Sequence, residues 1–409
     1  MKVGILSQYF PPDSPGRFAD ELSQSLAARG HSVRVLTTFP HYDHGKTDPD
    51  FRQRAHSVEM RGAVAVRRVP IYSRHSRNPL GRIANYASFT WSAGLAKSFL
   101  KGADVIYVHG TPATVAQPAH ALERSRGIPF VYCVQDIWPE SVTGSDMLPR
   151  PLARTAESMI TSWLSRVYSR AAAVIVIAPH ARQLLQERGV PPERIHVVYN
   201  WARETPGSAI VERPAAPGLR LLYAGNLGAF QDVETILRAV AQVSDLGDLR
   251  LDIAGAGVRE ASLRELAEQL GLQDRVTFLG RLGSPELARA YADSDFQFVT
   301  LRNLKIFAGT IPSKFQGGLA HGVPMITTVI GDVTRLVDEH GLGFTAVPED
   351  VGSLAAAIRR AYETSSEERG ALRSRARAFY EEHLTKENAV DKIEKILAAA
   401  ARSRNGARP

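Results

Sequence analysis

Short apolar runs alternate with amphipathic stretches along most of the chain. In the first half, strands are predicted at Val3–Ser7, Ser32–Thr37, Val64–Val69, Asp104–His109, Phe130–Gln135, Val174–Ile177 and Ile195–Val198. In the second half, they are predicted at Leu219–Ala224, Arg250–Ala254, Arg275–Leu279, Phe296–Thr300 and Met325–Thr328. Helical segments such as Phe18–Arg29, which Gly30 ends, lie between them. This alternation predicts an α/β fold of two Rossmann-like, doubly wound domains with parallel sheets.

The two halves are joined by a segment that lacks periodicity and is rich in Pro, Gly, Ala and Ser. We expect an N-terminal domain over 1–201, a linker over 202–218 and a second domain over 219–385. A C-terminal helix over 386–402 is expected to pack back on the first domain, before a disordered tail over 403–409. Since ligands of such sheets bind beyond the carboxyl ends of the strands, we expect the site in the crevice between the domains.

Composition narrows the function classes. The 409 residues are 44% hydrophobic and 22% charged, which is typical of a globular protein. The single cysteine, Cys133, excludes an internal disulfide and a Cys-rich zinc site, and favours a reducing compartment. The sequence has no apolar stretch typical of a signal peptide or a membrane span, so we expect a cytoplasmic protein.

The net charge of +8 is concentrated in one part of the chain. From Met60 to Ala103 there is no Asp or Glu, and the basic 61–101 region holds eight cations: Arg61, Arg67, Arg68, Arg74, Arg77, Arg82, Lys97 and Lys101. Such a region predicts contact with phosphates or with an anionic membrane at the inner face of the cell. The alternative is a solvated basic face. Nucleic acid is not indicated, because no nucleic-acid-binding signature accompanies the charge.

Candidate chemistry in the second half lies in loops that follow strands. Glycine-containing loops at Ala224–Gly228, Ala254–Gly257 and Leu279–Gly283 let the main chain approach a ligand, and Gly255 is one such contact. The segment Gly309–Thr328 predicts a further site. Pro312 suits a helix start, Ser313 can cap the free amides, and the helix is expected to run to about His321.

A helix N-terminus offers unpaired N–H donors and partial positive charge, so this one is predicted to bind a diphosphate. Gly309 and Thr310 form the entry to the helix. Lys314 in the first turn opposes the helix dipole unless an anion lies between them; its alternative is a solvated lysine. Lys305 and Arg302, just upstream, add positive charge.

The first half offers residues at the ends of its own strands. Gly16 and Arg17, at the start of the first helix, are candidate phosphate contacts. His109 ends one strand and is a candidate general base or hydrogen-bond donor to a sugar. Asp136 follows the next strand and is a candidate for orienting the acceptor. Both side chains are also common as ordinary loop hydrogen-bonding groups.

With these residues in place, the chain resembles the retaining GT-B glycosyltransferases of family 4. The similarity is carried by ILSQYFPPD, VQDIWPES and YNWA in the first half, and by LLYAGNLG, LDIAGAGVREASLRELAEQLGLQDRVTFLGRL and TIPSKF…AHGVPMI in the second. In detail it is most similar to the subgroup that builds O-antigen, capsule and colanic acid, such as fucosamine transferases. The resemblance implies a nucleotide-sugar donor, with UDP favoured over GDP, bound by the second domain.

Carried over residue by residue, the resemblance is incomplete. The family's Arg and Lys against the diphosphate are replaced by Asn226 and Gln231, and its two glutamates by Gly309 and Gly317. Ribose recognition must therefore differ. Gln135 stands where many members have a histidine, and the main chain around Arg281 corresponds to the loop that contacts the base.

The resemblance implies a retaining transfer, in which the leaving phosphate can take the acceptor proton. No Asp-x-Asp pattern ends a predicted strand, so no obligatory metal and no cofactor are expected. The acceptor is either a lipid diphosphate at the membrane or a soluble molecule, as in antibiotic and other secondary-metabolite glycosides. Two other classes remain: a sugar-nucleotide 2-epimerase, and a non-catalytic nucleotide-sugar-binding protein.

Overall fold

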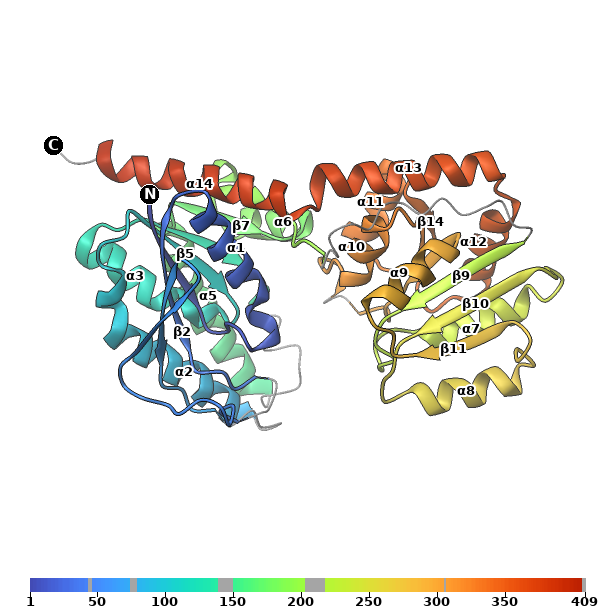
Figure 1. Cartoon of the computed structure of the whole chain (residues 1–409), viewed down its shortest axis with the longest axis horizontal. Helices are drawn as coiled ribbons and strands as arrows, with labels where there is room; N and C mark the ends of the chain where they lie inside the picture. The colour runs from blue at the N-terminus through green and yellow to red at the C-terminus, as the bar shows by residue number, and fades with distance from the viewer. Residues whose placement is uncertain (43–45, 74–78, 139–149, 203–217, 305–306, 407–409) are drawn as a thin grey trace. The chain divides into compact units, whose positions relative to one another are not determined.

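The chain forms two compact units, Met1–Asn200 with Ala389–Pro409, and Trp201–Asn388. The computed structural model describes residues 1–42, 46–73, 79–138, 150–202, 218–304 and 307–406. Each unit contains one largely parallel sheet flanked by helices (Figure 1), which confirms the predicted α/β fold with two Rossmann-like domains. Most of the predicted linker lies outside the described residues.

The first unit has an eight-stranded sheet in the order β3-β4-β2-β1-β5-β6-β7-β8. Its strands are β1 (Lys2–Ser7), β2 (Ser32–Thr38), β3 (Ser57–Arg61), β4 (Val64–Val69), β5 (Val105–Gly110), β6 (Phe130–Val134), β7 (Ala173–Val176) and β8 (Ile195–Val197). Its helices are α1 (Arg17–Ala28), α2 (Pro79–Ala96), α3 (Ala116–Arg126), α5 (Arg150–Arg170), α6 (Pro179–Glu187) and most of α14 (Lys386–Gly406).

The central strands are buried on both faces, as the continuous apolar runs predict. Side chains of α2, α3 and α5 share one core with alternate strand residues such as Leu6, Val108 and Tyr132. Helix α1 contacts β1, β2 and β4. Strand β3 was not predicted: it pairs antiparallel with β4 at the edge of the sheet, and most of its residues are exposed, so the hydrophobic pattern gives no signal.

The second unit has a six-stranded sheet in the order β11-β10-β9-β12-β13-β14. Its strands are β9 (Leu219–Ala224), β10 (Leu249–Ala254), β11 (Val276–Gly280), β12 (Phe296–Val299), β13 (Met325–Thr327) and β14 (Gly343–Thr345). Its helices are α7 (Val233–Gln242), α8 (Glu260–Gln269), α9 (Ser284–Asp293), α10 (Ser313–Ala320), α11 (Asp332–His340), α12 (Val351–Glu363) and α13 (Ser366–His383). All paired strands are parallel. The three-residue β14 was also not predicted.

Helix α14 belongs with the first unit from Ala389 onward. The Arg29 guanidinium contacts Asp391 at 2.5 Å and Glu394 at 2.6 Å, and His31 Nε2 lies 2.7 Å from Glu394. The helix continues to Gly406, so the predicted disordered tail is wrong for residues 403–406. A run of alanines favours the helix, and the Ser403 hydroxyl donates to the carbonyl of Ala400. Residues 407–409 lie outside the described chain.

Candidate active site

Three loops of the second unit follow neighbouring strands at the carboxyl edge of its sheet. The N–H of Gly225 donates to the carbonyl of Ala254 at 2.8 Å, and the N–H of Gly255 donates to the carbonyl of Gly280 at 2.7 Å. A β-carbon on Gly255 would overlap the carbonyl oxygen of Gly225. The close approach of the two main chains therefore requires a glycine at 255. Its contact with a ligand stays a prediction.

The structure brings Asn226 and Gln231 together. Both follow β9, and a β-carbon on Gly228 would lie 2.7 Å from Asn226 Nδ2 and 2.6 Å from Gln231 Oε1. The loop is fixed at both ends, because the Tyr223 hydroxyl donates to the carbonyl of Asn226 at 2.7 Å and the Thr300 hydroxyl donates to that of Gln231 at 2.6 Å. The two amide side chains are thus held over one turn, where they can hydrogen-bond a polar ligand.

Lys314 lies next to this loop. Its Nζ donates to the Tyr223 hydroxyl at 2.7 Å and lies 4.3 Å from the centre of the Tyr223 ring. Burial lowers the pKa of Lys314 to about 7. The aromatic partner and the desolvation explain how a lysine is accommodated in the first turn of α10. Lys314 therefore gains and loses its proton readily near neutral pH.

Helix α10 begins as predicted at Ser313, but Ser313 is not its cap. Pro312 occupies the N-cap position, and its carbonyl accepts from the N–H of Phe315 at 2.9 Å, with no side-chain cap. Ser313 is the first helical residue and is exposed, so its hydroxyl no longer stands before the first amides. Gly309 and Thr310 precede it, and the N–H of Thr310 donates to the carbonyl of Phe307 at 2.9 Å.

The remaining cations predicted for this unit differ in their surroundings. Arg302 is paired with Glu349 at 3.1 Å and also donates to the carbonyl of Ala229, so its charge is already compensated. Arg281 is exposed and directly follows β11. Lys305 lies outside the described residues. Arg302 and Lys314 thus both lie beside the β9 loop, and Lys314 is the one of the two whose charge no described carboxylate compensates.

His109 is the last residue but one of β5 in the first unit and is buried, with 4% of its surface exposed. Its ring centre lies 6.5 Å from that of Phe18 and 6.4 Å from that of Tyr107. Burial lowers the pKa of His109 to about 4, and within the described chain its Nδ1 has no hydrogen-bond partner. The ring is therefore neutral at pH 7. A base with so low a pKa has little driving force to take a hydroxyl proton.

Asp136 lies where the sequence predicts, just after β6. The register of β5 and β6 pairs Gly110 with Val134, which brings the loops after the two strands together. Burial raises the pKa of Asp136, and the side chain of Thr111 from the neighbouring loop acts against that shift. The residue is nevertheless accessible to solvent, so it can contact a ligand.

Gly16 and Arg17 are engaged within the fold. Gly16 is buried before α1, its N–H donates to the carbonyl of Asp13 at 3.0 Å, and a β-carbon there would overlap the main chain of Phe10. The N–H of Gly16, which was predicted to contact a phosphate, therefore already has a hydrogen-bond partner within the protein. Arg17 is paired with Glu21 at 3.3 Å and lies over the Phe18 ring.

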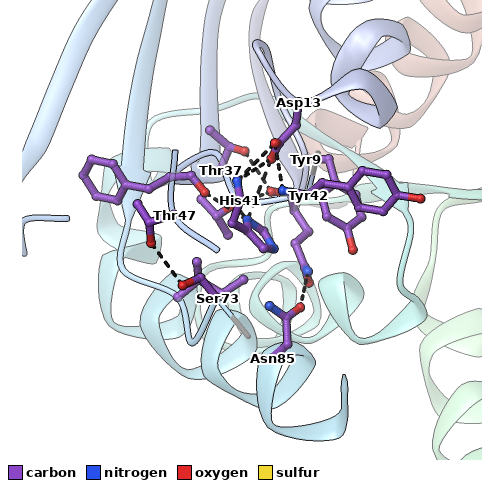
Figure 2. A network of polar contacts seen from close by, with 12 residues as sticks. Tyr9, Asp13, Thr37, His41, Tyr42, Thr47, Ser73 and Asn85 are labelled. Atoms are coloured by element: carbon purple, nitrogen blue, oxygen red, sulfur yellow. Dashed lines mark hydrogen bonds and ion pairs between the residues drawn. The ribbon is translucent and has the colours of Figure 1, made fainter. Parts of the chain in front are cut away.

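The loops after β1 and β2 form a polar cluster that was not predicted from the sequence. The Asp13 carboxylate accepts from the N–H of His41, at 3.0 and 3.1 Å, and from the N–H of Tyr42 at 2.9 Å. The Gln8 side chain donates to Asn85 of α2 at 2.8 Å. Figure 2 shows the carboxylate turned toward this loop, with Asn85 on the neighbouring helix. The available signal was an aspartate within the FPPD loop that directly follows a strand.

Tyrosines surround this cluster. The Tyr9 ring lies 5.6 Å from that of His41 and 5.1 Å from that of Tyr42. The pKa of Tyr9 is raised chiefly by burial, and also by Tyr86, Tyr42 and Asp13, whereas Arg82 lowers it. These groups therefore lie around the Tyr9 phenol. Tyr9, Asp13 and His41 are buried, whereas Tyr42 is 39% exposed, so Tyr42 is the ring that a sugar can reach.

The basic 61–101 region is only partly available to a partner. Arg61 forms two 2.8 Å hydrogen bonds with Asp20. Arg68 is buried and donates to Glu59, to the carbonyl of Thr38 at 3.0 Å and to that of Pro11 at 2.7 Å. Arg74 and Arg77 lie outside the described residues. The predicted patch of eight cations is thus reduced, since two of them support the fold.

Exposed apolar residues follow one another at helical spacing on α2. Ile83, Trp91 and Leu95 are 49%, 72% and 68% exposed, and Ala87 between them is exposed as well. A spacing of four residues places them along one side of the helix.

None of the described helices is both long and apolar enough to cross a membrane. Among all the residues that the structure describes, no three His, Cys, Asp or Glu residues are grouped so as to hold a metal ion.

Two family models match the chain one after the other. The model described as glycosyl transferase 4-like domain covers residues 15–201, and that described as glycosyl transferases group 1 covers residues 218–364. Together with the two α/β units, these matches define a glycosyltransferase of the GT-B class. The chain belongs to glycosyltransferase family 4, as its sequence resemblance implied.

Two curated relatives cover most of the chain. A probable glycosyltransferase, WbjE of Pseudomonas aeruginosa, is 25% identical over 80% of this chain and 84% of its own length. A putative colanic acid biosynthesis glycosyl transferase, WcaI of Escherichia coli, is 24% identical over 88% of this chain and 92% of its own length.

Solved structures share the fold. Sucrose-phosphate synthase of Thermosynechococcus elongatus matches with a TM-score of 0.68 at 17% identity, over 98% of this chain and 100% of that one. Anabaena HepE in complex with UDP matches with a TM-score of 0.64 at 16% identity, over 98% and 100% of the two chains. HepE has also been solved in complex with UDP-glucose.

Proposed function

We propose that this glycosyltransferase moves a sugar, with retention at the anomeric carbon, from a UDP-sugar to a lipid diphosphate acceptor in cell-surface polysaccharide synthesis. Lys314 beside the β9 loop carries the donor side of the proposal. The UDP and UDP-glucose complexes of HepE support a UDP-sugar, and the relationship to WcaI supports a polysaccharide pathway.

The donor diphosphate is assigned to the N-terminus of α10. Its first amides have no side-chain cap, and Lys314 can move from the Tyr223 hydroxyl to a phosphate oxygen that accepts the ammonium. As the bond between the anomeric carbon and the phosphate oxygen breaks, negative charge develops on the phosphate. A charged Lys314 and the main-chain N–H groups stabilise that charge, so no metal ion is required.

The acceptor hydroxyl attacks the anomeric carbon from the face that the phosphate leaves, and its proton passes to the leaving phosphate oxygen. His109 is a weak base because of its low pKa, which supports this route. Asp136 is proposed to orient the acceptor hydroxyl. Asn226 and Gln231 are proposed to hydrogen-bond the donor in place of the charged residues of other family members.

The acceptor is assigned to the exposed side of the cluster around Tyr9 in the first unit, at Tyr42, because Tyr9, Asp13 and His41 are buried. Arg82 lies close enough to act on the Tyr9 phenol, and it begins the turn of α2 that carries Ile83. Arg82 beside this aromatic cluster fits a diphosphate. The exposed apolar stripe of α2 that follows it, formed by Ile83, Trp91 and Leu95, fits an attached lipid. The soluble acceptors of antibiotic and other secondary-metabolite synthesis have no need of that stripe.

The donor assignment is tested by substituting Lys314. Lys314→Met removes the ammonium but keeps a long side chain over Tyr223, so we expect UDP-glucose to bind at least about tenfold more weakly, because a hydrogen bond to a charged group is worth about 1.5–3 kcal/mol. Isothermal titration measures the affinity. Lys101→Met, an exposed lysine of the first unit, is the control and is expected to bind normally. Unchanged binding by Lys314→Met rejects the assignment.

The membrane assignment is tested by flotation with vesicles. The protein is expected to float with vesicles that contain phosphatidylglycerol and to be released by salt, because exposed apolar residues and basic charge act together. Trp91→Glu is expected to abolish flotation, whereas Val258→Glu, which alters an exposed valine of the second unit, is not. Equal flotation of both variants, or none of the unaltered protein, favours a soluble acceptor.

A further inference from the structure

A groove of about 900 Å³ lies in the first unit, away from the strand-end loops described above. It is lined by residues of α14 between Lys392 and Ser403, by Arg182 of α6 and by residues of β7 and β8. Ala172, Ala173, Pro192 and Glu193 place one end of it at the amino ends of these two strands. His109, in contrast, lies near the carboxyl end of β5, and Asp136 follows the carboxyl end of β6.

The lining is rich in positive charge. Lys392 and Lys395 reach the groove from α14 and Arg182 reaches it from α6, whereas Glu193 is the one acidic residue of the lining. Within the described chain, no ion pair joins these three cations to a carboxylate. His196 also lines the groove. Its pKa is lowered by burial and then by Arg182, which shows that the guanidinium lies near the imidazole.

The two sides of α14 differ in charge. Asp391 and Glu394 are paired with Arg29, and Glu394 also contacts His31, so the acidic side of the helix is used in packing on the first unit. The lysines face the groove instead. Since two lysines on one helix repel each other and Arg182, an anion between them is favoured.

The groove also runs along the open edge of the sheet. It is lined by four consecutive residues, Ile195 to Val198, although side chains along a strand alternate between its two faces. A groove that meets all four must lie beside the main chain of β8, which is the last strand of the sheet. Main-chain groups on that edge have no neighbouring strand and can bind a polar ligand. Ile396 and Ala399 of α14 add apolar surface.

We infer that this groove binds a nucleotide: a small molecule with several phosphate charges and a flat, partly apolar ring system. The phosphates lie between Lys392, Lys395 and Arg182, and the ring system lies on the apolar surface of Ile396 and Ala399. A volume of about 900 Å³ falls in the range of about 300–1,000 Å³ typical of small-molecule sites. The ligand bridges α14 to α6 and β8, so binding slows the local opening of α14.

The experiment uses the full chain and ATP as the probe. Hydrogen exchange is expected to slow in residues 392–403 and 195–198 when ATP is added, and titration calorimetry is expected to give a salt-sensitive affinity. In the variant Lys392→Gln/Lys395→Gln, the affinity is expected to fall at least about tenfold, because two charge-assisted contacts are lost. Arg124→Gln/Arg126→Gln removes two exposed cations of α3 and is the matched control.

Four outcomes overturn the inference. The first is the absence of protection in α14 and β8, and the second is equal affinity in the lysine variant and the unaltered protein. The third is equal affinity for inorganic triphosphate, which carries the charge without the ring system. Protection confined to residues 225–231 and 313–316 is a further contrary result, since ATP then occupies the donor loops alone. UDP-glucose binding and its dependence on Lys314 are measured separately, so either proposal can fail by itself.

Discussion

At the scale of single residues, the donor side of the site depends on the protonation of Lys314. Its side chain is held by the Tyr223 hydroxyl and ring, and the hydroxyl in turn donates a hydrogen bond to the carbonyl of Asn226. Burial, which lowers the pKa of Lys314 to about 7, disfavours the ammonium when no anion is present. A bound diphosphate reverses that preference, so binding of the donor and uptake of a proton are coupled.

The coupling predicts how affinity depends on pH. Below about pH 7, Lys314 is already charged and the affinity for UDP-glucose is flat. Above it, each binding event must also take up a proton, so affinity falls by up to about tenfold per pH unit until the pKa of the complex is reached. UDP-glucose is the suitable probe, because its diphosphate does not titrate in this range. Calorimetry from pH 6 to pH 9 measures the slope.

Lys314→Met gives the control for this prediction. The variant has no group that titrates near pH 7 at this position, so its weaker binding is expected to be independent of pH over the same range. An identical slope in the variant and the unaltered protein would assign the proton to another residue.

Residue types alone could not predict most of these contacts. Lys314 was singled out because a cation opposes the helix dipole, but its partner Tyr223 lies 91 positions earlier in the sequence and is reached only through the parallel pairing of the sheet. Gly16 and Gly255 stay predicted ligand contacts, but both also lie where another main chain approaches. Nothing in the sequence indicated that second role, because it depends on the neighbouring loop.

At the scale of elements, Arg68 joins three segments of the first unit. From β4, it donates to the carbonyl of Pro11 in the loop after β1, to the carbonyl of Thr38 at the end of β2, and to Glu59 of β3. Burial lowers the pKa of Arg68, and the nearby Glu59 opposes that shift. The side chain therefore fixes the loop that carries Tyr9 and Asp13 against the sheet.

Loss of this side chain is expected to destabilise the first unit. Arg68→Met leaves one buried and one part-buried carbonyl group without their donor, and we expect the free energy of unfolding to fall by about 1.5–3 kcal/mol. Urea denaturation measures it. Arg61→Met is the control, because Arg61 forms an exposed pair with Asp20, and such pairs contribute about 0–1 kcal/mol. Equal losses in the two variants would contradict the role given to Arg68.

The elements themselves were largely predictable. Strands β4 and β9 were predicted with their observed bounds, because both are rich in apolar residues even though each also contains arginine. Strand β3 escaped notice because it pairs antiparallel at an edge, where exposed residues such as Met60 replace the apolar pattern. The start of α10 was correct, but the role of Ser313 was not, because helix caps are decided within a single residue.

At the scale of the whole molecule, the family and the paired α/β units follow from sequence order and are borne out. The donor sugar, the acceptor and the stereochemistry depend on a few side chains in loops, where this chain departs from its family. Gly309 and Gly317 replace the two glutamates of the family. Whether this protein transfers a sugar at all is therefore the first thing to measure.

The central claim is that main-chain N–H groups and Lys314 stabilise the departing diphosphate and that a sugar is transferred to an acceptor. The most direct test is to incubate the protein with labelled UDP-glucose, a lipid diphosphate acceptor and excess EDTA, and to analyse the products. The account predicts labelled lipid product with the anomeric configuration of the donor, at a rate that EDTA does not change. Isomerised donor, no product, or product that disappears with EDTA would contradict it.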